Sequence, residues 1–90
     1  MRSITISPFW KLFDALPLEV QQHARQAFLQ FQNDPFYPSL MFKEVNQKYD
    51  VWSARIDDQY RVLGYRRDGE IRWFWIGVHA EYDRIIGRMK

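Results

Sequence analysis

The 90-residue sequence has no cysteine, almost no net charge and no long run of apolar residues. Without cysteine, neither a disulfide framework nor a thiolate zinc site can hold the fold together. No apolar run approaches the roughly 18 residues that a membrane-spanning helix needs. The opening segment, MRSITISPFW, is too short and too polar for a signal peptide. We therefore expect a cytoplasmic protein with no membrane partner.

The excess of positive over negative charge is also small, because thirteen Lys and Arg and eleven Asp and Glu give a net charge of +2. This excess alone says little about nucleic acid. Hydrophobic residues make up 47% of the chain and aromatic residues 18%, which is ample for one core but too little for two. We expect a single domain over residues 1–90. Two histidines, one of them an exposed His23, offer too few ligands for a metal site, so we expect no metal or other cofactor.

Apolar periodicity predicts an α+β fold in which a strand and a helical hairpin precede a sheet. Residues 3–6 alternate polar and apolar as in a half-buried strand. One helix is expected from Pro8, after an N-cap at Ser7, to about Leu16. Pro17 interrupts it, and a second helix follows that stops at Asn33-Asp34-Pro35. Period-two patterns then predict strands at 41–45, 51–56, 59–66 and 71–78, a turn on Asp68-Gly69 and a short helix from Ala80. The expected result is a mostly antiparallel sheet of four to five strands with the helices on one face.

Side-chain alternation divides these strands into two faces. The face suited to pack under the helices contains Trp52, Ala54, Ile56, Tyr60, Val62, Phe74, Ile76 and Val78. The open face contains Ser53, Arg55, Arg61, Tyr65, Trp73, Trp75 and His79. We expect burial of Phe28, Phe31, Val62, Phe74 and Ile76. Leu63, Ile71, Trp73 and Trp75 are apolar enough to be core residues themselves, so the division is not forced.

The mixture of arginine and aromatic residues on the open face suits phosphates and unstacked bases. Five arginines lie between Arg55 and Arg72, interleaved with tyrosines and followed by two tryptophans. The alternative is a solvated sheet face whose long side chains cover aromatic rings. An apolar, cationic face of this kind favours a binding partner.

Three segments carry a resemblance to a known family: WSARI at 52–56, QYRVLGY at 59–65 and WFWIGVHAEYD at 73–83. Their order and spacing resemble the RelE/ParE superfamily, the toxins of type II toxin–antitoxin systems, and the resemblance covers essentially the whole chain. The G-x-H-x-x-Y-D ending at 77–83 is similar to that of the YafQ-like ribonuclease toxins. The resemblance implies a metal-independent endoribonuclease that cuts messenger RNA, usually in the ribosomal A site, and that a cognate antitoxin silences.

The implied reaction is attack of an RNA 2′-hydroxyl on its own phosphodiester, which leaves a 2′,3′-cyclic phosphate and a 5′-hydroxyl. By this resemblance, Arg61 would stabilise the charge of the transition state, Arg55 would be a second phosphate contact and His79 would protonate the leaving oxygen. The residues expected to bind substrate are Lys43, Tyr65, Trp73, Trp75 and Tyr82. The general base stays open between Lys43 and Glu44.

Structural interpretations compete with these roles. A histidine at a strand end is often only a hydrogen-bonding residue, and Tyr82 could simply pack the last helix. Arg61 could be the salt-bridge partner of Asp57, Asp58 or Glu70, and Asp83 with Arg84 could form a surface pair. Two other functions also remain: a ParE-like toxin that poisons DNA gyrase without cutting RNA, and a non-toxic interaction module of the same fold.

Overall fold

The computed structural model describes residues 1–89, and this part of the chain forms three α-helices and one five-stranded sheet. The elements are β1 (Arg2–Thr5), α1 (Phe9–Asp14), α2 (Leu18–Asn33), a 3-10 turn η1 (Pro38–Leu40), β2 (Lys43–Asn46), β3 (Val51–Arg55), β4 (Tyr60–Arg67), β5 (Glu70–Val78) and α3 (His79–Arg88). The sheet order is β1-β5-β4-β3-β2, antiparallel except for the parallel pair of β1 with β5. The α+β prediction is therefore confirmed. None of the described helices is long and apolar enough to cross a membrane.

The local sequence predicted the β4–β5 turn correctly but did not predict the first residues of two helices. Asp68 and Gly69 form the β4–β5 turn with φ of 55° and 74°, the left-handed values that a two-residue hairpin turn requires. Helix α1 begins at Phe9, and Pro8 is its N-cap rather than its first helical residue. Helix α3 begins at His79, immediately after β5. The predicted histidine at a strand end is therefore the first residue of a helix.

The main core lies between the sheet and the hairpin of α1 and α2. Phe31, Val62 and Ile76 are buried in it as predicted, whereas Phe28 is only partly buried at its edge. Three aromatic rings that pack against one another within it are those of Phe31, Phe42 and Trp73. The core thus takes its aromatic residues from the helices, the loop before β2 and the sheet.

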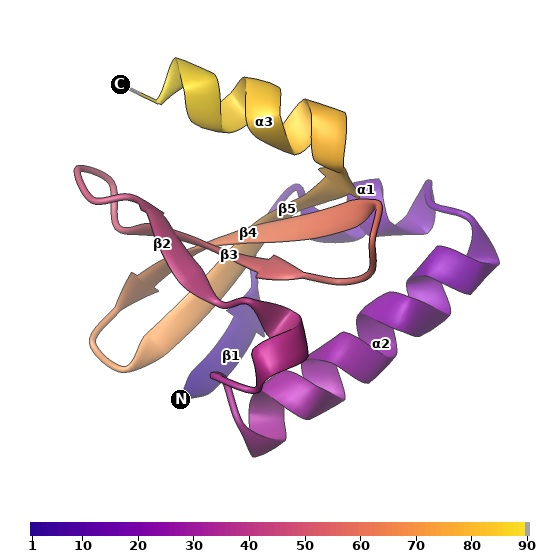
Figure 1. Ribbon diagram of the computed structural model, residues 1–90, viewed down its shortest axis with the longest axis horizontal. Helices are drawn as coiled ribbons and strands as arrows, with labels where there is room; N and C mark the ends of the chain where they lie inside the picture. Colours follow the sequence, from indigo (N-terminus) through magenta and orange to yellow (C-terminus); the bar gives the residue numbers. More distant parts are fainter. Residues whose placement is uncertain (90) are drawn as a thin grey trace.

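Helix α3 covers the opposite face of the sheet, which corrects the expectation that all helices share one face (Figure 1). Its Tyr82 is buried with Val51 and Leu63, and Ile85 and Ile86 pack beside them. Leu63 is fully buried on this face, so apolar side chains on both faces of the sheet are shielded from water. The predicted open face is therefore partly covered by α3.

A β-bulge in β5 overturns part of the predicted division of faces. Leu63 pairs with Trp75, but the next residue, Gly64, pairs with Trp73, so Phe74 is extra and the facing of the strand reverses there. Trp73 is only 1% exposed in the main core and donates a hydrogen bond to Ser3 Oγ at 2.9 Å. Its placement on the open face was wrong, and so was the burial of Phe74 under the hairpin.

Candidate functional site

A small pocket of about 110 Å³ lies where the start of α3 meets β2, β3 and β4. Its lining residues are Met41, Lys43, Ser53, Arg55, Arg61, His79 and Tyr82. Five of the residues predicted from the sequence to act on RNA, drawn from four different elements, therefore lie around one pocket.

The two arginines are neighbours because Arg55 and Arg61 are direct partners in the β3–β4 register. Like charges opposite each other are unfavourable, so each needs a compensating contact. Arg61 Nη1 donates to the backbone carbonyls of Asp57 at 2.7 Å and Tyr60 at 3.0 Å. Arg55 instead forms an ion pair with the exposed carboxylate of Asp58. Within residues 1–89 no carboxylate pairs with Arg61, so the pocket keeps its positive charge.

His79 is oriented by a carboxylate one helical turn further along α3. Its Nδ1 lies 2.9 Å from Asp83 Oδ2, and its backbone N–H donates to the carbonyl of Gln59 at 2.7 Å. With Nδ1 occupied, Nε2 is the ring nitrogen left for chemistry. The side chain is 47% exposed and therefore reachable. The predicted pair of Asp83 with Arg84 is not formed, because Arg84 pairs with Glu81 instead.

Tyr82 and Ser53 form the floor of the pocket. Tyr82 is buried and its hydroxyl donates to Ser53 Oγ at 2.9 Å, which ties α3 to β3. Its ring packs against the His79 imidazole with centroids 5.5 Å apart. The packing interpretation of Tyr82 thus fits its surroundings. Strand alternation predicted Ser53 on the same face as Arg55, Arg61 and His79, but not that it would be buried there.

The strand register also separates Lys43 from Glu44. Lys43 is opposite Ser53 and lines the pocket, whereas Glu44 is opposite Trp52, whose side chain packs on the other face of the sheet. Glu44 is thereby placed away from the two arginines. Of the two candidates for a base, only Lys43 reaches the pocket.

The remaining predicted substrate contacts lie elsewhere. Tyr65 is 40% exposed, stacks on Phe74 with centroids 4.4 Å apart, and borders a separate depression of about 800 Å³. Trp75 is partly buried beside α3, where its ring lies over Gly77. Trp73 is in the core and cannot stack on a base. These three aromatic residues do not join the pocket.

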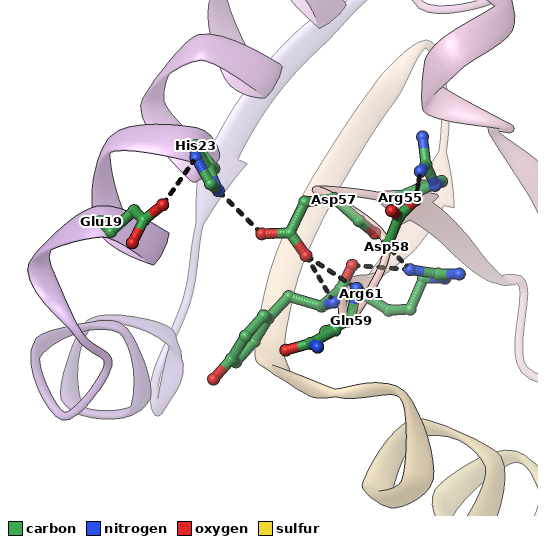
Figure 2. A network of polar contacts seen from close by, with 8 residues as sticks. Glu19, His23, Arg55, Asp57, Asp58, Gln59 and Arg61 are labelled. Atoms are coloured by element: carbon green, nitrogen blue, oxygen red, sulfur yellow. Dashed lines mark hydrogen bonds and ion pairs between the residues drawn. The ribbon is translucent and has the colours of Figure 1, made fainter.

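The turn that joins β3 to β4 is organised by Asp57 (Figure 2). Asp57 Oδ1 accepts from the backbone N–H groups of Gln59 at 2.8 Å and Tyr60 at 2.9 Å, and Oδ2 lies 2.8 Å from His23 Nδ1. Burial alone would raise the pKa of Asp57. The hydrogen bonds from His23 and from the two N–H groups outweigh it and lower the pKa below the ordinary 3.8.

His23 was expected to be exposed, but it is half-buried against Asp57. No pattern in the sequence joins these residues, which are 34 positions apart. Among residues 1–89 there is no group of three His, Cys, Asp or Glu side chains that could hold a metal ion.

The pocket combines three cationic side chains with a histidine, and its described lining contains no carboxylate. Such a site favours an anion. Arginine and lysine can stabilise the extra negative charge of a pentacoordinate phosphorus, and a histidine beside them can donate a proton to a leaving oxygen. The arrangement is suited to phosphodiester chemistry.

Solved structures of similar fold come from several toxins. A RelB–RelE antitoxin–toxin complex from Methanococcus jannaschii aligns with a TM-score of 0.71 and 14% identity, covering 90% of this chain and 96% of the other. The YoeB/ParE toxin from Agrobacterium tumefaciens aligns at 0.67 and 13% over 88% and 99%. YafQ from Escherichia coli aligns at 0.64 and 14% over 91% and 98%. At these identities the likeness establishes the fold.

Sequence comparison identifies the family. No curated protein matches the sequence as a relative. The family model described as the ParE-like toxin domain does match it, over residues 18–84, which is most of the chain and extends from the start of α2 into α3. The chain therefore belongs to the ParE-like toxin domain family.

Proposed function

We propose that this toxin is a metal-independent endoribonuclease that cleaves messenger RNA and thereby inhibits translation in the cytoplasm. The observation that carries the proposal is the single pocket shared by Lys43, Arg55, Arg61 and His79. These side chains supply fixed positive charge and a titratable group at one place. Such a set suits the 2′-hydroxyl reaction of RNA, which needs no metal ion.

In the proposed reaction, the RNA 2′-oxygen attacks the adjacent phosphorus while its proton passes to water. Arg61 and Lys43 bind the non-bridging oxygens, and their charges stabilise the phosphorane. Arg55 joins them when the phosphate displaces Asp58 from its guanidinium. The bond to the 5′-oxygen then breaks, and protonated His79 delivers the Nε2 proton to that oxygen. The products are a 2′,3′-cyclic phosphate and a 5′-hydroxyl.

Asp83 supports this role of His79. The carboxylate oxygen Oδ2 of Asp83 lies 2.9 Å from the ring nitrogen Nδ1 and accepts its N–H. It also fixes the ring orientation, so that the proton to be donated sits on Nε2. His79 is further held by the bond from its backbone N–H to Gln59. Acid and phosphate-binding groups are thus kept in one arrangement before RNA binds.

We also propose a cognate antitoxin as the protein partner. Two of the similar structures, from Methanococcus jannaschii and Pyrococcus horikoshii, are complexes of RelE with RelB. The cationic pocket and the exposed side chain of Met41 beside it suit a peptide with acidic and apolar residues. Recovery of a small acidic partner with the toxin from its native host is the expected result.

A second candidate function is the poisoning of DNA gyrase without RNA cleavage, because the matching family model is that of ParE-like toxins. Expression of the toxin in cells distinguishes the two. The proposal predicts an early stop in protein synthesis with messages cut internally. A block of replication with intact messages would replace the ribonuclease proposal with the gyrase one.

A further inference from the structure

The turn between β3 and β4 contacts three of the four groups expected to act on the phosphate, namely Arg55, Arg61 and His79. The backbone carbonyl of Asp57 accepts from Arg61 Nη1 at 2.7 Å. The next residue, Asp58, pairs with Arg55, and the carbonyl of Gln59 accepts from the backbone N–H of His79 at 2.7 Å. Any shift of this turn would therefore move both arginines and the histidine together.

The turn is in part held from outside the sheet, by α2. His23 Nδ1 on α2 lies 2.8 Å from Asp57 Oδ2, and the other carboxylate oxygen of Asp57 receives two backbone N–H groups of the turn (Figure 2). Asp58 and Gln59 are exposed. Apart from the ladder bond from Ile56 N–H to the Tyr60 carbonyl and the bonds from His79 and Arg61, the Asp57 carboxylate is the main support of this segment.

We propose that His23 and Asp57 are positioning residues: their contact anchors the β3–β4 turn to α2 and so fixes the Arg61 guanidinium at the pocket. Neither side chain lines the pocket that holds Arg61 and His79. Their effect passes through the backbone carbonyl of Asp57. The structural claim concerns Arg61 alone, and only its kinetic consequence rests on the proposed ribonuclease function.

The physical reason is geometric. Guanidinium groups stabilise a transition state only when they are held close to their productive positions, and a displacement of about 1 Å can cost up to a hundredfold in rate. The carbonyls of Asp57 and Tyr60 hold Nη1 of Arg61 in place, while its Nη2 and Nε donors stay available. Loss of the anchor on α2 lets the Asp57 carbonyl move, and Arg61 then samples several orientations.

The test compares four variants with the wild type. His23→Ala removes the anchor, and Asp57→Asn keeps the acceptor for the turn N–H groups but removes the charge that faces His23. His23→Asn restores a donor near the Nδ1 position and should rescue. Glu19→Gln is the matched control, because Glu19 lies 4.0 Å from the other ring nitrogen of His23 and does not contact the turn.

The first readout is the ¹⁵N order parameter of the Arg61 guanidinium, measured by NMR at a temperature where every variant is fully folded. The inference predicts a mobile Arg61 in His23→Ala and Asp57→Asn, and a wild-type Arg61 in His23→Asn and Glu19→Gln. The second readout is cleavage of single-stranded RNA, with kcat expected to fall about tenfold in the first two variants while KM changes less than twofold.

Arg61 order that is unchanged in both His23→Ala and Asp57→Asn would overturn the inference. Equal losses of kcat in Glu19→Gln would do the same, since they would point to a general effect of charge. A wild-type protein that cuts no RNA would defeat the proposed function but not the anchor, which the NMR readout judges separately.

Discussion

At the scale of single residues, the two arginines of the pocket differ in what holds them. Arg61 is held by neutral carbonyls, whereas Arg55 is paired with the carboxylate of Asp58, whose side chain is 90% exposed. A bound phosphate must compete with that carboxylate. Asp58 therefore weakens anion binding, although an exposed pair of this kind contributes little to stability.

Replacement of Asp58 by Asn should tighten RNA binding. An exposed ion pair amounts to roughly 0.5–1 kcal/mol, which corresponds to about a two- to fivefold lower Kd at low salt. The gain should disappear at high salt, where exposed charges are screened. Asp50→Asn is the matched control, since Asp50 pairs with Arg67 at the other end of β4. Equal tightening by both variants would mean that net charge, not release of Arg55, causes the effect.

The residues of the pocket could be predicted from the sequence better than their partners. The family motif indicated Arg61, Arg55 and His79, and all three line the pocket. Asp83 was missed as the partner of His79, because the helix was expected to begin at Ala80. A helix that begins at His79 puts the two at i and i+4, where side chains meet.

At the scale of elements, the bulge in β5 depends on a glycine. A Cβ at Gly64 would lie 2.8 Å from Trp73 Cε3 and 2.9 Å from Ile71 Cδ1, both in buried side chains. Glycine therefore lets the Trp73 ring pack directly over β4. The bulge and the burial of Trp73 belong together.

Gly64→Ala should consequently destabilise the protein by about 1–3 kcal/mol, the usual cost of forcing extra volume into a packed core. Gly87→Ala is the control, because Gly87 lies in α3 with nothing within 4 Å of an added Cβ. That change should stabilise the protein by roughly 0.5–1 kcal/mol through helix propensity. Urea unfolding measures both, and a Gly64→Ala protein as stable as the wild type would contradict this view of the bulge.

The order and type of most elements follow from local sequence pattern. The bulge in β5 and the face of the sheet on which α3 packs do not. Period-two alternation assigns each side chain of β5 to a face only if the strand has no extra residue, and Phe74 is one. The side on which α3 packs is likewise set by Leu63 and Val51, which become core residues only when Tyr82 covers them. Both outcomes depend on packing between distant segments.

At the scale of the whole molecule, Asp57 links stability to pH. Its pKa is lowered in the folded protein, so the fold favours the ionised carboxylate. This contribution is present above the ordinary value of 3.8 and is lost as the pH falls through the lowered pKa. The stability advantage of wild type over Asp57→Asn should therefore shrink below about pH 4. Urea unfolding from near neutral to acid pH checks this, and a constant difference would contradict it.

The central claim is that Arg61 and His79 act on an RNA phosphodiester, and cleavage of message by purified protein in EDTA tests it most directly. We expect cleavage by the wild type, a loss of about 10²–10³-fold in Arg61→Ala and a loss of about 10²–10⁴-fold in His79→Gln. Arg67→Ala, at the other end of β4, should cleave normally. Wild-type activity that vanishes in EDTA, or a His79→Gln protein with an unaltered rate and pH profile, would contradict the account.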